Sequence, residues 1–129
     1  MQKDRSKFHI LVVDDNQPAR QLVKSTLALA GYTSITEAVD GTKALEAIQK
    51  RRFDLIICDW DMPGTSGIEV LRAVRADEER STLPFLMVTA NQQRDFVEAA
   101  IAAGVNDYVA KPYRLNTLNE KAARLLGGG

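Results

Sequence analysis

Short apolar runs alternate along the chain with segments of helical periodicity. The three strongest runs, at residues 10–13, 55–58 and 85–88, are continuous rather than alternating. Strands that are buried on both faces have this pattern, which is typical of parallel sheets. Weaker strands are predicted at residues 34–38 and 107–110. The pattern therefore predicts a parallel sheet that is covered on both faces.

Helices with recognisable ends are predicted after each of these strands. The first is expected from Pro18 to Ala30, because proline suits a first turn and Gly31 suits the position after the end. The others are expected after residues 40–41, from Ser66 onward, over residues 92–103 and over residues 115–126. Strands and helices alternate in this way along the whole chain, which predicts an α/β fold of three layers.

Two details of these helices follow from local signals. In the first helix, Leu22, Val23 and Leu27 have the spacing of a buried face. At the third helix, Ser66 and Glu69 have the spacing of a capping box, in which each side chain bonds the backbone N–H of the other residue.

Composition limits the classes of function. A chain of 129 residues can bury one core, so residues 1–129 are interpreted as a single domain, with a flexible tail at residues 127–129. Seventeen basic residues balance seventeen acidic ones, which argues against direct binding of nucleic acid. The apolar runs are too short for membrane insertion. A single cysteine and the absence of a signal peptide favour a cytoplasmic location.

Carboxylates, a hydroxyl group and a lysine follow the ends of four predicted strands. Asp14 and Asp15 follow the first strand, and Asp59 follows the third. Thr89 follows the fourth strand and Lys111 the fifth. Ligands of open parallel sheets bind beyond the carboxyl ends of the strands. We therefore expect these five side chains to meet at one edge of the sheet.

This set of residues favours phosphoryl transfer over an ordinary loop role. Each residue alone would fit a turn, a helix cap or a solvated surface. Together, the crowded carboxylates must be protonated, paired or bound to a metal. Mg²⁺ (or Mn²⁺) prefers such oxygen ligands, and a nearby lysine adds the positive charge that a transferring phosphoryl group requires. A carboxylate can itself attack phosphorus and form an acyl phosphate.

Four motifs make the chain resemble bacterial response-regulator receiver domains, and most closely the single-domain chemotaxis type. They are Val13-Asp14-Asp15, Asp59-Trp60-Asp61-Met62-Pro63-Gly64, Thr89-Ala90 and Lys111-Pro112. The resemblance extends from about His9 to Leu126. It implies a flavodoxin-like (βα)5 sandwich whose parallel strands lie in the order 2-1-3-4-5.

The resemblance also implies a phosphoacceptor and a metal site. Asp59 is expected to accept the phosphoryl group. Asp15 and Asp59 are expected to bind the metal, together with Asp14, which would act mostly through water. The fourth contribution is expected from Asp61, through its backbone carbonyl.

The remaining motif residues are implied to hold the phosphoryl group and to report on it. Lys111, Thr89, Trp60 and Ala90 are the expected phosphoryl-binding residues. Thr89 is also the expected switch hydroxyl, and Tyr108 is the aromatic residue that would turn inward when Thr89 moves. The Lys111-Pro112 peptide bond is expected to be cis, which proline tolerates.

The resemblance thus implies a switch in a two-component system. The donor would be a histidine kinase or a phosphotransfer protein, and the altered surface of the fourth helix, fifth strand and fifth helix would control a downstream protein target. The unphosphorylated protein is expected to be a monomer. It would not be an enzyme beyond catalysing its own phosphorylation and dephosphorylation.

Two alternatives remain at this point. The chain could be an interaction module with the receiver fold that works without phosphorylation. It could also be a phosphatase of the haloacid-dehalogenase kind, because Asp59-Trp60-Asp61 has the Asp-x-Asp pattern of those enzymes. In that family, however, the nucleophile follows the first strand.

Asp61 departs from the commonest pattern of the chemotaxis type, which carries asparagine at that position. We predict that its charge strengthens metal binding and changes the lifetime of the phosphoryl group. Asn91, two residues after Thr89, is the other position that the resemblance places near the water path to the acyl phosphate.

Overall fold

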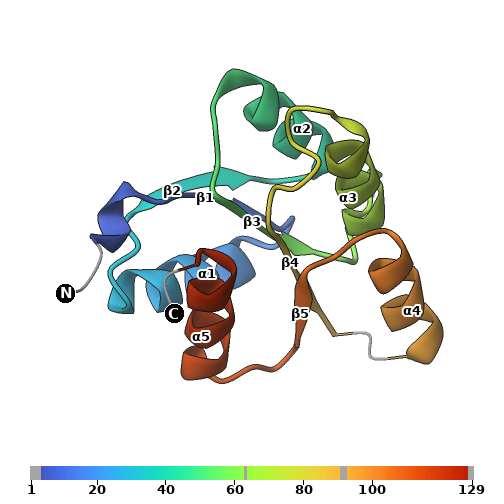
Figure 1. Cartoon of the computed structure of the whole chain (residues 1–129). Coiled ribbons are helices and arrows are strands. Elements are labelled where there is room, and N and C mark those ends of the chain that lie inside the picture. The colour runs from blue at the N-terminus through green and yellow to red at the C-terminus, as the bar shows by residue number, and fades with distance from the viewer. Residues whose placement is uncertain (1–3, 63, 91–92, 128–129) are drawn as a thin grey trace.

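The sheet is parallel throughout and has five strands. In the computed structural model, which describes residues 4–62, 64–90 and 93–127, the strands pair in the order β2-β1-β3-β4-β5 (Figure 1). Their bounds are β1 His9–Val13, β2 Ser34–Ala38, β3 Leu55–Asp59, β4 Phe85–Thr89 and β5 Asp107–Ala110. The predicted fold class and the strand order implied by the resemblance are both confirmed.

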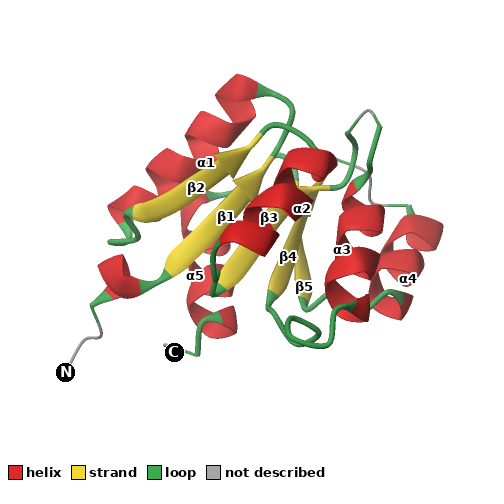
Figure 2. Cartoon of the chain, turned by 90° about the horizontal axis from the view of Figure 1, so that it is seen from above, coloured by secondary structure: helices red, strands yellow, loops and turns green. Residues whose placement is uncertain are grey.

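Helices cover both faces of this sheet (Figure 2). Their bounds are α1 Gln17–Leu29, α2 Gly41–Lys50, α3 Gly67–Ala76, α4 Arg94–Ala102 and α5 Leu115–Leu125. A short 3-10 helix, η1 Arg5–Lys7, precedes β1. Helices α1 and α5 lie on one face, and α2, α3 and α4 lie on the other. Among the described residues, no helix is long and apolar enough to cross a membrane.

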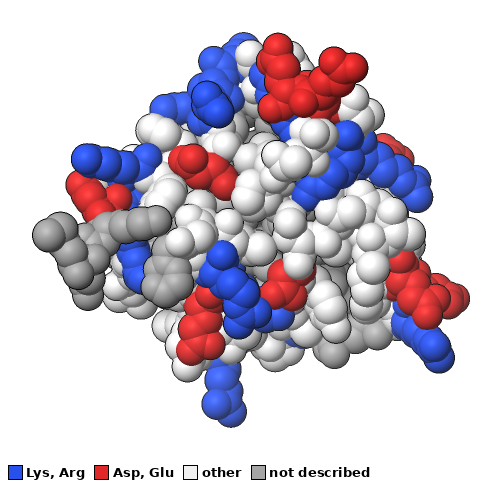
Figure 3. Space-filling model, viewed as in Figure 1, with Lys and Arg blue, Asp and Glu red and all other residues white. Residues whose placement is uncertain are grey.

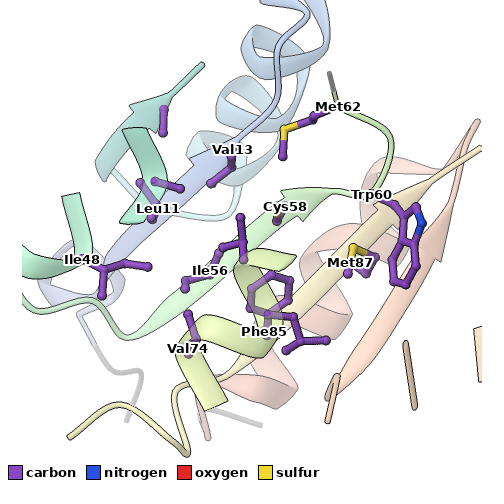
Figure 4. Packing of buried hydrophobic residues seen from close by; sticks show 14 of the residues in the cluster. Leu11, Val13, Ile48, Ile56, Cys58, Trp60, Met62, Val74, Phe85 and Met87 are labelled. Atoms are coloured by element: carbon purple, nitrogen blue, oxygen red, sulfur yellow. The ribbon is translucent and has the colours of Figure 1, made fainter. Parts of the chain in front are cut away.

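Alternate residues of the strands point to opposite faces of the sheet and belong to two separate hydrophobic cores. Ile10, Val12, Ile57 and Leu86 are among the side chains that face α1 and α5. The core on the other side, part of which Figure 4 shows, is larger and contacts α2, α3 and α4. Its labelled members are Leu11, Val13, Ile48, Ile56, Cys58, Trp60, Met62, Val74, Phe85 and Met87. The central strands are therefore buried on both faces, as their continuous apolar runs predict.

Two local predictions about the helices are wrong. Leu22 is 49% exposed, and the buried face of α1 is formed by Val23, Thr26 and Leu27. Ser66 precedes α3 as its N-cap but makes no capping hydrogen bond through its side chain. The Gly67 N–H instead donates to the backbone carbonyl of Trp60 at 3.1 Å. The loop after β3 thus supplies the partner for one N–H of the first turn.

The fourth helix differs in extent from its prediction. It begins at Arg94, and its predicted first residue, Gln92, lies outside the described residues. The predicted tail at residues 127–129 also lies outside them, apart from Gly127.

Candidate metal and phosphoryl site

Three carboxylates meet at the carboxyl edge of the sheet. Val13 pairs with Cys58, so the residues that follow them, Asp14 and Asp59, lie side by side at the ends of neighbouring strands. One oxygen of each of these carboxylates and one of Asp15 all lie within 4.8 Å of one another. Asp14 and Asp59 are buried, whereas Asp15 is exposed.

Hydrogen bonds hold Asp14 in place. Its Oδ1 accepts from the Asn16 N–H at 2.9 Å. Its backbone carbonyl accepts from Arg20 Nη1 at 2.8 Å, and Arg20 also pairs with Glu37 at 3.1 Å. Asn16 in turn caps α1, because its side chain accepts from the Ala19 N–H. The start of α1 therefore fixes the direction in which the Asp14 carboxylate points.

Lys111 brings a positive charge to the same place. Its Nζ lies 3.5 Å from Asp14 Oδ2 and 3.6 Å from Asp59 Oδ1. Its backbone N–H donates to the Thr89 carbonyl at 2.8 Å, which places the residue beside the end of β4. The Lys111-Pro112 peptide bond is cis, as the resemblance implies. The lysine thus offsets part of the negative charge of the carboxylates.

The environment of Asp59 disfavours a negative charge. Burial is the largest cause and raises the pKa of Asp59 from 3.8 to about 6. The Lys111 ammonium opposes this rise, and the Asp14 carboxylate adds to it. The Asp61 N–H lowers the pKa and the Asp61 carboxylate raises it, both with smaller effect. Lys111 alone therefore does not offset the effect of burial on Asp59, and a bound cation would favour the charged form of this carboxyl group.

The donor set fits a hard divalent cation. The oxygens of Asp14, Asp15 and Asp59 are close enough to share one ion, and Mg²⁺ or Mn²⁺ takes such oxygen ligands. The Asp61 side chain is exposed and its carboxylate is outside this group. The ligand predicted at this position is the backbone carbonyl, and that role stays a prediction.

The expected switch residues lie beside a small cavity behind the site. Thr89 is buried at the end of β4, and Tyr108 on β5 is partly buried. Together with Trp60 and Phe96 they line a cavity of about 10 Å³. That volume suits at most one water molecule, so a Tyr108 ring that turned inward would require its neighbours to move.

The structure places the other predicted phosphoryl-binding residues at the same edge. Trp60 directly follows Asp59 and is buried, and Ala90 directly follows Thr89 and is exposed. Pro63, part of one recognised motif, and Asn91 lie outside the described residues. Cys58 is buried, and burial raises the pKa of its thiol well above the usual value, so the residue belongs to the core rather than to the chemistry of the site.

Two residues near the site were missed by the sequence analysis. The Phe96 ring on α4 meets Trp60 edge-on, with centroids 5.8 Å apart and an interplanar angle of 71°. Gly67 approaches Asp59 so closely that a Cβ atom there would lie 2.5 Å from the Asp59 carbonyl oxygen. A glycine at the first position of the helix after the acidic strand was the available signal for this second contact.

Comparison with known proteins decides the family. The family model for the response regulator receiver domain matches residues 10–123. The chain belongs to the response regulator receiver family. The haloacid-dehalogenase alternative is therefore not supported, and Asp59 indeed ends the third strand rather than the first.

Individual relatives of this receiver domain are chemotaxis proteins and parts of sensor kinases. Chemotaxis protein CheY of Pseudomonas aeruginosa is 47% identical over 116 residues, which cover 90% of this chain and 94% of that protein. The structure of CheY4 of Vibrio cholerae has a TM-score of 0.85 at 36% identity, over 92% of this chain and 98% of that one.

A second similar structure contains a metal. It is the receiver domain of a sensor histidine kinase from Pseudomonas aeruginosa, solved with a magnesium ion coordinated in its active-site cleft. It has a TM-score of 0.85 at 32% identity and covers 93% of this chain and 98% of that one. The receiver domain described here is thus CheY-like, and its acidic cluster fits phosphorylation and metal binding.

Proposed function

We propose that Asp59 accepts a phosphoryl group from a phosphohistidine, in the presence of Mg²⁺ or Mn²⁺, and that the protein acts as a switch in two-component signalling. The observation that carries this proposal is the position of one buried carboxylate, Asp59, between two further carboxylates and the Lys111 ammonium. The donor would be a histidine kinase or a phosphotransfer protein.

The transfer uses the geometry of Asp59 and its neighbours. A carboxylate oxygen of Asp59 forms a bond to phosphorus while the N–P bond of the phosphohistidine breaks, and the imidazole nitrogen keeps the electron pair. Lys111 Nζ, 3.6 Å from Asp59 Oδ1, is placed to hold a phosphoryl oxygen. The other phosphoryl oxygens would be held by Thr89, by Trp60, which follows the phosphoacceptor, and by Ala90, which follows Thr89.

A bound divalent cation would neutralise charge on the transferred oxygens. Asp14 and Asp15 would hold the cation together with Asp59 and the carbonyl of Asp61. The hydrogen bonds to Asp14 support this assignment, because they fix its carboxylate before any ligand arrives.

The proposed output is a changed surface over α4, β5 and α5. Attraction of the Thr89 hydroxyl to the phosphoryl group would leave room for Tyr108, and the two packings would exchange populations. Thr89 and Tyr108 line the same small cavity, so a movement of one side chain changes the space open to the other, which supports this coupling. The surface also offers apolar side chains to a protein target, since Ile101 on α4 is 63% exposed and Leu115 on α5 is 45% exposed.

The wider properties of the protein follow from this role. We propose that it turns over no substrate other than its own phosphoryl group, that it is a monomer before phosphorylation, and that it works in the cytoplasm. The alternative, a module that binds its partner without phosphorylation, would make Asp59 dispensable for partner binding.

Phosphorylation can be tested directly on the purified protein. Acetyl phosphate with Mg²⁺ should add one phosphoryl group, seen by intact-protein mass spectrometry, and should change the fluorescence of Trp60, which directly follows Asp59. Asp59→Asn should abolish both changes while the protein stays folded. Unchanged labelling of Asp59→Asn, or no labelling of the folded wild type, would contradict the proposal.

A further inference from the structure

A hollow of about 740 Å³ lies at the edge of the sheet opposite the candidate site. It opens between the α2–β3 and α3–β4 connections, which lead into the first residues of β3 and β4. Its apolar lining includes Ile48, Phe53, Leu83 and Pro84. The volume is within the range of ligand sites, roughly 300–1000 Å³. The proposed phosphoryl chemistry makes no use of it.

One wall of this hollow carries three consecutive cations, Lys50, Arg51 and Arg52, called here the basic corner. Basic side chains gather at this place, over the end of α2 and the connection to β3, at the upper left of Figure 3. Arg51 lies over the Phe53 ring, 5.9 Å from its centroid. Lys50 and Arg52 are exposed, and neither side chain makes a hydrogen bond or ion pair with a residue in the described ranges.

Two carboxylates, Asp54 and Glu79, also line the hollow, and each has a contact with another part of the chain. Asp54 Oδ2 accepts the His9 N–H at 2.8 Å. Across the hollow, Arg80 Nη1 lies 2.6 Å from Asp77 Oδ2 and 3.7 Å from Glu79 Oε2. The lining of the hollow carries four cations, Lys50, Arg51, Arg52 and Arg80, against two carboxylates, Asp54 and Glu79. The hollow therefore has an excess of positive charge, and most of it belongs to the basic corner.

The hollow continues into an apolar groove between α2 and α3. This second space, of about 410 Å³, shares Ile48, Gln49 and Arg80 with the first. Leu45 and Val74 are among its further lining residues. The α2–α3 groove, as we call this second space, thus leads from apolar side chains directly to the basic corner.

We propose that the α2–α3 groove and the basic corner together bind a peptide segment of a partner protein, with an apolar side chain next to acidic residues. The apolar side chain would pack between Leu45 and Val74, and the carboxylates would meet Lys50 and Arg52. Charge complementarity favours an acidic partner, because the lining of the hollow carries more cations than carboxylates.

This docking site is independent of the phosphorylation state. Its residues precede β3 and β4, whereas Asp59 and Thr89 end those strands. A partner held here would stay close to the receiver domain while the α4-β5-α5 surface changes. The proposal therefore goes beyond the phosphoryl switch and can be tested on Asp59→Asn protein.

The test is a titration of ¹⁵N-labelled full chain with the synthetic peptide Leu-Phe-Glu-Asp-Glu-Glu, followed by NMR. Amide shifts of α2, of α3 and of the two connections should change saturably, and added salt should weaken binding. The double variant Lys50→Glu, Arg52→Glu should weaken binding about tenfold or more, because each rim charge contributes a modest favourable energy. The matched variant Lys7→Glu, Arg72→Glu carries the same charge change outside the groove and should bind within about twofold of wild type.

Several results would overturn the proposal. The proposal fails if the amide chemical shifts stay unchanged at a peptide concentration of about 1 mM, since the dissociation constant would then be too weak for a useful interaction. If the peptide Gly-Gly-Glu-Asp-Glu-Glu bound as tightly as Leu-Phe-Glu-Asp-Glu-Glu, the apolar groove would contribute nothing and binding would rest on attraction between charges alone. Self-association that depends on Lys50 and Arg52 would point to a second copy as the occupant. Phosphorylation by acetyl phosphate should be the same in the Lys50→Glu, Arg52→Glu variant, so either proposal can fail without the other.

Discussion

A Cβ atom on Gly67 would lie 2.5 Å from the carbonyl oxygen of Asp59 and 2.8 Å from the Cα atom of Trp60. The first turn of α3 thus rests directly on the backbone of the predicted phosphoacceptor. Gly67→Ala would force one of these backbone segments to shift, and we expect a loss of about 1–3 kcal/mol in the free energy of unfolding. Phosphorylation by acetyl phosphate should also slow, because the Asp59 carboxylate would be displaced.

Ser66→Ala is the matched control for this change. The Ser66 side chain makes no capping hydrogen bond, so its loss should change the free energy of unfolding by no more than about 0.5 kcal/mol. Urea denaturation of both variants gives the comparison. A Gly67→Ala protein as stable and as readily phosphorylated as wild type would show that the contact with Asp59 imposes no constraint.

The raised pKa of Asp59 predicts that this residue destabilises the metal-free protein near neutral pH. A carboxyl group whose pKa rises from 3.8 to about 6 on folding binds its proton more tightly in the folded state. The penalty is therefore absent below about pH 3.8, grows between the two values and is complete above about pH 6. Asp59→Asn should stabilise the metal-free protein above that range by about 1–3 kcal/mol.

Urea denaturation across this pH range, with a chelator present, measures the effect. The advantage of Asp59→Asn should disappear at the acidic end, and Mg²⁺ should reduce it near neutral pH by stabilising the wild type. A constant difference between the two proteins at all pH values would mean that the ionisation of Asp59 is not its cause.

Arg75 joins three segments of the fold, and no carboxylate within residues 4–62, 64–90 and 93–127 pairs with it. Its guanidinium donates to the carbonyls of Gly104 at 2.9 Å and Leu83 at 2.7 Å, and to Asn106 Oδ1 at 2.7 Å. Asn106 Oδ1 also accepts the Phe85 N–H at 2.8 Å. Arg75→Met should cost about 2–4 kcal/mol, because a charged donor is lost and several acceptors are left without it.

Arg72→Met provides the comparison for this third prediction. Arg72 is exposed on the same helix, so its replacement should leave the free energy of unfolding within about 0.5 kcal/mol of wild type. Amide hydrogen exchange should become faster at Phe85 in the Arg75 variant. Equal stability of the two variants would show that the guanidinium contacts contribute nothing net.

The sequence predicts the parts of this molecule that depend on pattern and topology. Continuous apolar runs mark the buried strands. In a parallel sheet the residues after those strands must share an edge, and for this reason the proximity of Asp14, Asp59 and Lys111 could be predicted from the sequence. The strand order came from the resemblance, because local pattern does not determine how strands are arranged.

Contacts between distant segments were not predictable in this way. Helical spacing did not resolve which residues at the border of the buried face of α1 turn outward, so Leu22 was placed inside. The Trp60–Phe96 contact joins two residues far apart in sequence. Two of the three Arg75 acceptors are backbone carbonyls, which every residue has and which therefore leave no signal in the sequence.

Asp61 allows a test of how charge at the mouth of the site affects the metal. Its carboxylate is exposed, and it contributes to the raised pKa of Asp59. Asp61→Asn removes that charge while keeping the backbone carbonyl and N–H. We expect the affinity for Mg²⁺ to fall by about two- to fivefold at low salt, since an exposed charge acts through a high dielectric.

Trp60 fluorescence during a Mg²⁺ titration measures the affinity, and the decay of the phosphorylated protein gives the lifetime of the acyl phosphate. Glu120→Gln, which removes an exposed charge from α5, should leave both quantities unchanged. The lifetime in Asp61→Asn should differ from wild type, because the carboxylate either orients an attacking water or repels it. If neither the Mg²⁺ affinity nor the lifetime changes, the Asp61 charge has no role at the site.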